Sequence, residues 1–245
     1  MIKKITLILF LSICVSCTKE KVEIVPQNLQ EYLNINSGLI ADEVIACAAS
    51  DKIDATTSYI FYYPVLGASE IQYFETDNTN INEKDFSLYK KRTLQKEGVF
   101  NGYLERFVRN DVKEVWSIVT YKTNGKLHKS NPIRLKHQSK STEWNNQVAI
   151  DFTENTSPKF TWKDGVHKEN EIYFQVVSDV NNDLLSGTYI YDTWFQYYKL
   201  DNVVLNVTTE KPPILEKNAD YNFTMMGVSL DNWVNLVIEK KLSIQ

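Results

Sequence analysis

The 245-residue chain has few of the residues that usually mark a catalytic or metal-binding centre. It contains only three histidines and three cysteines, and its eight glycines form no phosphate-binding loop. It also lacks a Gly-x-Ser-x-Gly elbow and a His-Glu-x-x-His zinc motif, and its one Cys-x-x-Cys spacing, from Cys14 to Cys17, lies at the end of the apolar N-terminal segment. We therefore expect no catalytic residues, no cofactor and no metal.

The chain also has no excess of positive charge, with 27 basic against 31 acidic residues. The net charge is −4, and residues 141–245 carry 15 acidic against 8 basic side chains. Proteins that bind nucleic acid depend on a basic surface. The sequence therefore predicts no nucleic-acid partner.

Long apolar runs are absent. After the N-terminal segment, no part of the chain approaches the roughly 18 consecutive apolar residues needed to span a bilayer. The N-terminus is different. Two lysines precede the short apolar stretch from Ile5 to Ile13, and small residues then lead to Cys17. This order of charge, short apolar run and small residues is typical of a secretory signal.

The end of this signal, Val15-Ser16-Cys17, resembles bacterial lipoproteins of the Bacteroidetes type, in which a small residue precedes an acylated cysteine. The resemblance implies that residues 1–16 are removed and that Cys17 carries the lipid. It also implies that the membrane is a partner and that the protein is held at the outer membrane, on its periplasmic or its surface side. Polar residues 17–37 predict a flexible tether. The alternative is an ordinary cleaved signal.

Cys47 is then the single cysteine left in the body of the chain. It lies among small apolar neighbours in the segment VIACAAS. No histidine lies in a setting that would make it a nucleophile. We expect a buried, inert thiol.

Beyond residue 40 the apolar residues recur mostly with a period of two. Two blocks of seven short strands each cover residues 38–137 and 147–245, and the polar segment 138–146 between them predicts a linker. This pattern favours an all-β fold with two antiparallel β-sandwich domains in tandem.

Three local patterns qualify this prediction. Asn124-Gly125 indicates a tight hairpin, because both residues tolerate positive φ. Segments 39–48 and 81–91 have enough helix propensity to be helical instead. Asp179-x-Asn181-x-Asp183 resembles the start of a calcium loop, but leucine and isoleucine replace the glycine and glutamate that such a loop needs, so a polar turn is favoured.

The second block resembles fibronectin type III domains. In that family a leucine stands six residues before a tyrosine whose hydroxyl ties a corner to nearby backbone, and Leu215 and Tyr221 have this spacing. Trp162 matches the core tryptophan of the second strand. In the first block, Ser130 and Pro132 resemble the start of the last strand, but the corner and the tryptophan are missing.

Segment 188–200 predicts one long strand with two different faces. Its core face would carry four aromatic residues, namely Tyr189, Tyr191, Phe195 and Tyr197. Trp194 and Tyr198 would lie on the opposite, exposed face, where flat aromatics can stack on sugar rings. Trp144 and Trp233 would add to this surface, or these aromatics fill the domain junction or cover a sheet edge.

Together these features favour a lipid-anchored, noncatalytic envelope protein whose sandwiches serve binding or assembly, with an envelope protein or a polysaccharide as partner. One alternative is a glycan-binding accessory lipoprotein that uses the exposed aromatics. Another is an envelope hydrolase, since 31 acidic residues leave room for the two carboxylates of a glycosidase.

Overall fold

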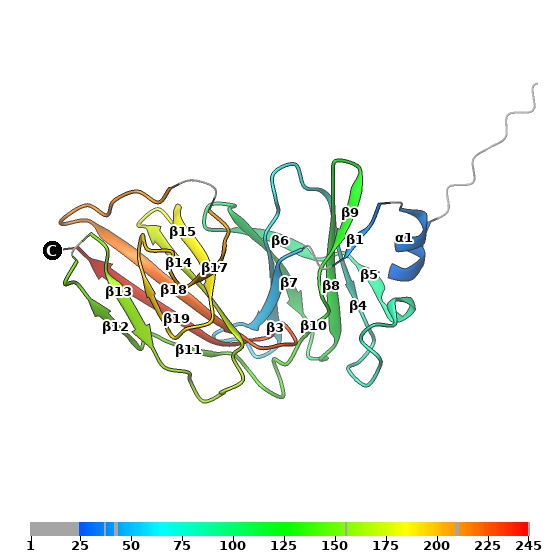
Figure 1. The fold of residues 1–245 in the computed structure, drawn as a ribbon. Coiled ribbons are helices and arrows are strands. Elements are labelled where there is room, and N and C mark those ends of the chain that lie inside the picture. The colour runs from blue at the N-terminus through cyan, green and yellow to red at the C-terminus, as the bar shows by residue number, and fades with distance from the viewer. Residues whose placement is uncertain (1–24, 37, 42–43, 155, 209–210, 245) are drawn as a thin grey trace, which may run out of the picture.

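The computed structural model describes residues 25–36, 38–41, 44–154, 156–208 and 211–244. The strands form two antiparallel β-sandwiches, domain 1 and domain 2, which follow each other along the long axis of the molecule (Figure 1). This confirms the predicted all-β fold. The predicted signal peptide and Cys17 lie outside the described residues. No helix in the described segments is long and apolar enough to cross a bilayer.

Domain 1 consists of two facing sheets. The first contains, in spatial order, β2 (Ala46–Ser50), β3 (Thr57–Tyr62), β7 (Leu104–Asn110) and β6 (Gln95–Val99). The second contains β1 (Ile40–Ala41), β9 (Lys126–Lys129), β8 (Trp116–Thr123), β4 (Ser69–Glu75) and β5 (Lys90–Arg92), with β10 (Ile133–Arg134) paired to β8. Alternate residues of both sheets, such as Ile60 and Val119, fill the core between them.

Domain 2 also has two sheets. The smaller contains β12 (Val148–Asp151), β13 (Lys159–Trp162) and β16 (Trp194–Gln196). The larger contains β11 (Glu143–Asn145), β19 (Val234–Ser243), β18 (Asp220–Val228), β14 (Ile172–Asp179), β15 (Leu184–Ile190) and β17 (Val203–Asn206).

The corner that the leucine and tyrosine spacing predicts is present in domain 2. The hydroxyl of Tyr221 accepts a hydrogen bond of 2.9 Å from the backbone N–H of Glu216, and Leu215 is buried beside it. Trp162 is buried on β13, the second strand after the connecting segment 138–146, and lies edge-on to Tyr173. The domain therefore has a fibronectin type III-like architecture.

The segment predicted as a tether is partly a helix, α1 (Leu29–Ile35), at the end of domain 1 that lies away from domain 2 (Figure 1). Asn28 caps it by accepting the N–H of Glu31. Its buried face, which includes Leu29 and Leu33, packs against Ile118 and its neighbours. The tether prediction is wrong for these residues, because their polar composition hides apolar residues spaced three and four apart.

The structure also tests two of the local predictions, the Asn124-Gly125 hairpin and the two segments with helix propensity. Asn124 and Gly125 both have positive φ, 50° and 74°, at the turn of the β8–β9 hairpin, as predicted. Segment 39–48 contains β1 and the start of β2, and segment 81–91 contains only the single 3-10 turn η1 (Phe86–Leu88) and the start of β5. Neither segment contains an α-helix among its described residues.

The segment predicted as a linker is held by both domains. β11 within it pairs in parallel with β19. Thr142 and Ser50 each donate a backbone N–H to the hydroxyl of the other, at 2.8 and 2.9 Å. The connection is therefore an ordered part of the junction.

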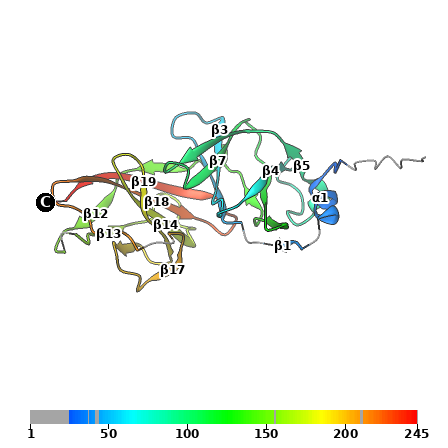
Figure 2. The ribbon, with the colours of Figure 1, turned by 90° about the horizontal axis from the view of Figure 1, so that it is seen from above.

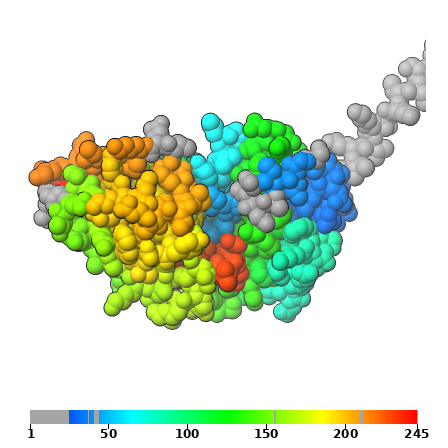
Figure 3. Space-filling model, in the orientation of Figure 1, coloured from blue at the N-terminus to red at the C-terminus, as the bar shows by residue number. Residues whose placement is uncertain are grey.

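The turn between β18 and β19 inserts Trp233 into domain 1. Figure 2 shows the two strands running lengthwise toward the junction, and the atoms of their turn lie between the sandwiches in Figure 3. The indole is fully buried in the core of domain 1 and donates to the carbonyl of Lys140 at 2.8 Å. The backbone of Ala48 bonds to that of Asn232 at 3.0 Å. The prediction that Trp233 belongs to an exposed aromatic surface is therefore wrong.

Candidate functional site

The outer face of the larger sheet of domain 2 lies against the outer face of the β2–β3–β7–β6 sheet of domain 1. On the domain 2 side, strand register aligns three rows across β14, β18 and β19 that grow more polar with distance from the packed junction. The rows are Phe174–Met226–Val237, then Val176–Thr224–Glu239, then Ser178–Asn222–Lys241. The apolar row packs against domain 1. In the two polar rows Val176 and Ser178 of β14 are buried, whereas the β18 and β19 members are half-buried (Asn222 and Thr224) or exposed (Glu239 and Lys241).

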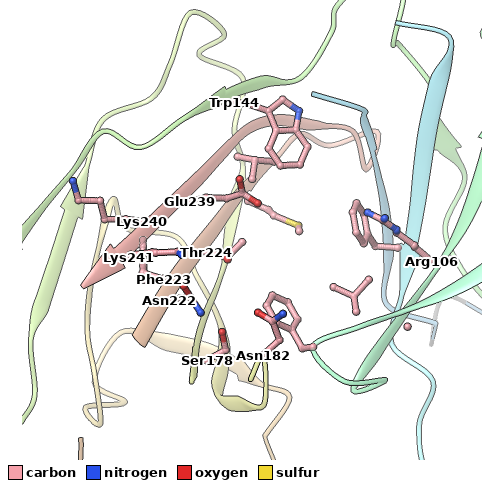
Figure 4. Close-up of a pocket in the computed structure, with 16 residues that line it drawn as sticks. Arg106, Trp144, Ser178, Asn182, Asn222, Phe223, Thr224, Glu239, Lys240 and Lys241 are labelled. Carbon is pink, nitrogen blue, oxygen red and sulfur yellow. The ribbon is translucent and has the colours of Figure 1, made fainter. Parts of the chain in front are cut away.

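A cleft of about 520 Å³ opens beside the polar rows (Figure 4). Its volume lies within the range of about 300–1,000 Å³ that is common for small-molecule sites. Apolar side chains from both domains, including Phe61 and Met226, form part of its lining. Ser178, Asn222 and Thr224 supply hydroxyl and amide groups.

Trp144 forms one side of the cleft and is half-buried. Its Nε1–H donates to the carbonyl of Ser50 in domain 1 at 3.1 Å, which fixes the orientation of the ring. The ammonium of Lys52 lies 5.8 Å from the ring centre and pairs with Glu239 at 3.3 Å. The indole is therefore a held, partly open aromatic surface.

Arg106 of β7 contributes the main cation on the domain 1 side. Its Nε and Nη2 both donate to one carboxylate oxygen of Glu97, at 3.0 and 2.8 Å. Its guanidinium carbon lies 3.7 Å from the ring centre of Tyr59. The side chain is thus fixed in place, and its charge is balanced by a neighbour.

The end of the cleft opposite Trp144 is formed by Ser178 and by Asn182 in the β14–β15 turn (Figure 4). Ser178 Oγ is buried and has no hydrogen-bond partner in the described part of the chain. Asn101 of domain 1 donates through Nδ2 to the carbonyl of Asn181 at 2.9 Å and to Asp183 Oδ1 at 2.7 Å, which ties the two domains together here. The turn is the polar one that the sequence predicts.

Trp194 and Tyr198 lie elsewhere, on the smaller sheet of domain 2. Trp194 faces outward, and the ammonium of Lys159 lies 4.4 Å from its ring centre. Tyr198 has a φ of 73° just beyond β16, and Lys211 lies 4.8 Å from its ring centre. Of the four predicted aromatics, Trp144 alone contributes to the cleft.

The single long strand predicted over 188–200 is wrong. The chain leaves the larger sheet at Ile190 and enters the smaller sheet at Trp194. Tyr191 in the turn between them is 66% exposed rather than in the core, whereas Phe195 is buried. A change of sheet breaks the alternation of faces, so the period of two does not carry across it.

The titratable groups near the junction offer little reactivity. Burial raises the pKa of the Cys47 thiol to about 12, so the thiol stays protonated at neutral pH. Among the described residues that line the cleft, Glu239 is the single carboxylate, and a glycosidase needs two. The described segments bring together no group of three metal-ligating side chains.

No family model matches the sequence, and no curated protein does. Three solved structures are similar to it. A two-domain fibronectin type III segment of chicken tenascin is 11% identical, covers 82% of this chain and 98% of its own, and has a TM-score of 0.29. Domains FN1–FN3 of chicken CNTN1 are 11% identical over 85% of this chain and 69% of theirs, with a TM-score of 0.30. The receptor tyrosine kinase Torso is 12% identical, covers 88% of this chain and 83% of its own, and has a TM-score of 0.24. At such low TM-scores the likeness adds nothing to the strand order described above.

Sequence reasoning missed the polar wall and the arginine of this cleft. The signal was present in alternate residues, because each contributing strand changes from apolar to polar along one face. Asn222, Thr224 and Met226 are an example on β18. Such a change marks where one sheet stops being covered by another.

Proposed function

We propose that this chain is a noncatalytic binding protein of a bacterial envelope, anchored through a lipid on Cys17, and that the cleft between its sandwiches is the binding site. The observation that carries this proposal is the polar wall on an otherwise packed junction. Apolar contacts join the domains on one side of this wall, and Asn101 bridges them on another. The cleft is therefore held open by the junction, as a preformed site requires.

The position of α1 agrees with an anchor on the domain 1 side. Helix α1 lies at the far end of domain 1, and β19 runs to the opposite end of domain 2 (Figure 1). An anchor that precedes α1 would hold domain 1 toward the membrane and leave domain 2 and the cleft farther from it. Two or three acyl chains suffice for such anchoring, since each buried methylene contributes about 0.8 kcal/mol.

The anchor is tested by fractionation of cells that express the full chain. We expect the wild type in the membrane fraction with acyl mass on Cys17, and we expect Cys17→Ser to be released from it. A Cys17→Ser protein that stays in the membrane fraction contradicts the anchor.

The site is tested by placing the photoreactive residue benzoylphenylalanine at Lys241, an exposed residue that lines the cleft. Thr161, exposed on the outer face of the smaller sheet, is the matched control. Irradiation of cells should give a discrete adduct from position 241 and none from position 161. No adduct at 241, or the same adduct at both positions, overturns the assignment of the cleft as the binding site.

A further inference from the structure

We propose that the ligand of the cleft is a neutral oligosaccharide, with one sugar ring stacked on Trp144 and its hydroxyl groups bonded to the opposite wall. This inference rests on the proposed function, because it names the chemistry of the same site. It moves sugar recognition from Trp194 and Tyr198, where the sequence places it, to the junction.

The first argument is the aromatic surface. Trp144 is half-buried, and its orientation is set by the bond from Nε1 to Ser50. A sugar ring presents C–H groups on its faces, which pack well on the electron-rich face of an indole. Because the ring is already held, stacking costs little side-chain entropy.

The second argument is the wall that faces this ring. Ser178, Asn222 and Thr224 lie on adjacent strands, which are about 4.8 Å apart. Ser178 Oγ is buried, with no protein partner in the described segments. Buried polar groups in folded proteins almost always have a partner. A ligand rich in hydroxyl groups can donate to and accept from such a wall at several points.

The third argument is charge. The strongest charges at the cleft are already paired, Arg106 with Glu97 and Glu239 with Lys52. An ionic ligand would have to compete with these contacts. Lys240 and Lys241 also line the cleft and have no ion pair among the described residues. Lys240 points away from the cleft in Figure 4, and Lys241 is exposed to solvent at the outer end of its row. Pairing of Arg106 and Glu239 favours an uncharged ligand, and the galacturonate oligomers named below test the effect of the two lysines.

The fourth argument excludes strand addition of a peptide at Ser178, Asn222 and Thr224, although β6 on the domain 1 side of the cleft is an edge strand. β14 is paired on both sides, to β15 and β18, and β18 lies between β14 and β19. Their backbone donors and acceptors are used within the sheet. Strand addition needs a free sheet edge, so recognition at this wall depends on side chains.

The proposal is tested by calorimetric titration of the full chain carrying Cys17→Ser with defined sugars. The probes are neutral hexasaccharides of glucose, mannose and xylose, oligomers of N-acetylglucosamine as the cell-wall arm, and oligomers of galacturonate as the charged arm. We expect at least one neutral oligosaccharide to bind with a Kd of about 1 mM or tighter. Failure of every neutral probe, or binding of galacturonate alone, overturns the proposal.

Variants locate the site. Trp144→Ala should weaken binding about ten-fold, whereas Trp194→Ala should leave it unchanged. Because Trp144→Ala also removes the bond to Ser50, Thr224→Trp serves as a second variant that fills the cleft from the other wall, with Thr161→Trp as its control. Equal loss in Trp194→Ala, or full binding by Thr224→Trp, contradicts a cleft site.

A smaller change tests the buried hydroxyl. Ser178→Ala should weaken sugar binding about three-fold, the effect of one hydrogen bond. Ser58 is the matched control, because its Oγ is also buried without a partner but does not line the cleft. Equal affinities for the two serine variants contradict a role for Ser178.

The two levels of the proposal fail differently. A cleft that gives a protein adduct at position 241 but binds no sugar disproves the ligand class and keeps the function. A cleft that gives no adduct and binds no sugar disproves both.

Discussion

Domain 2 fills its core with its own side chains, whereas domain 1 takes one from its neighbour. In domain 2, Phe160 stacks on Phe223 with 4.1 Å between ring centres, and every member of the core cluster comes from the same domain. The core of domain 1 includes Trp233, which belongs to the last hairpin of domain 2. Two domains of the same architecture can therefore differ in whether each supplies all the side chains of its own hydrophobic core.

The cores also differ in charge. Domain 1 buries Arg109 of β7 against Glu75 of β4, with 2.7 Å from Nε to Oε2, so that the ion pair joins its two sheets. Tyr73 donates to the same oxygen at 2.9 Å, and Arg92 lies 3.0 Å from the other. Removing one member of such a pair costs more than the pair contributes, because the partner charge stays buried.

The largest expected effect comes from the borrowed side chain. Trp233→Ala should lower the free energy of unfolding by about 3–5 kcal/mol, because it leaves a cavity in domain 1. Native-state hydrogen exchange should show lost protection in β3 and β8 and retained protection in the Phe160 and Phe223 strands. Equal loss in both domains would show that domain 2 also depends on this contact. Trp194→Ala is the control. Because Trp194 is only half-buried, this variant should lower the free energy of unfolding much less.

The ion pair is expected to come next. Glu75→Gln should cost about 3 kcal/mol, since Arg109 is left buried with a weaker partner. Urea unfolding measures this loss. Asp77, two residues away, pairs with Lys90 on the surface, and Asp77→Asn should leave stability unchanged. If both variants behave alike, burial of the charge in domain 1 has no energetic consequence.

The corner of domain 2 should have a smaller effect. Tyr221→Phe removes the acceptor for the N–H of Glu216 and should cost about 1 kcal/mol. Thermal unfolding of this variant should be compared with that of Tyr191→Phe, whose side chain is exposed. Identical curves would mean that the corner does not stabilise the domain.

The smallest expected effect is a pH dependence in domain 1. Burial lowers the pKa of His137, and Arg109 adds to this, although a bond to the carbonyl of Asp111 opposes it. Between about pH 7 and 5 the unfolded chain, with a histidine pKa of about 6.5, binds more protons than the folded chain. Stability should therefore fall as the pH falls through this window, and His137→Asn should reduce the slope. The free energy of unfolding is measured with urea at each pH. If its slope with pH is the same in His137→Asn as in the wild type, other groups cause the pH dependence.

The sequence predicts features that local physics determines. The period of two predicts an all-β fold, the Asn124-Gly125 pair predicts a hairpin, and the six-residue spacing before Tyr221 predicts the corner. Each depends on a few neighbouring residues, so no knowledge of tertiary packing is needed.

What could not be predicted depends on contacts between distant segments. The residues proposed to bind ligand come from three strands that are far apart in the sequence. They are Trp144 on β11, Ser178 on β14, and Asn222 and Thr224 on β18. Their proximity depends on sheet register and on how the outer faces of the two sheets diverge. Trp233 lies beside a strand and gives no local sign that it enters another domain. The break after Ile190 is a change of sheet, which an alternating pattern conceals.

The place of Trp233 after all the strands of domain 1 has a consequence for how the molecule forms. In order from the N-terminus, residue 233 follows every strand of domain 1 and all strands of domain 2 but β19, so the core of the first sandwich stays incomplete until the β18–β19 hairpin is present. Multidomain proteins usually fold one unit after another in order of synthesis. Here the slot beside Ala48 stays open until the last hairpin arrives, and shortening the chain before that hairpin would leave both halves with uncovered apolar surface.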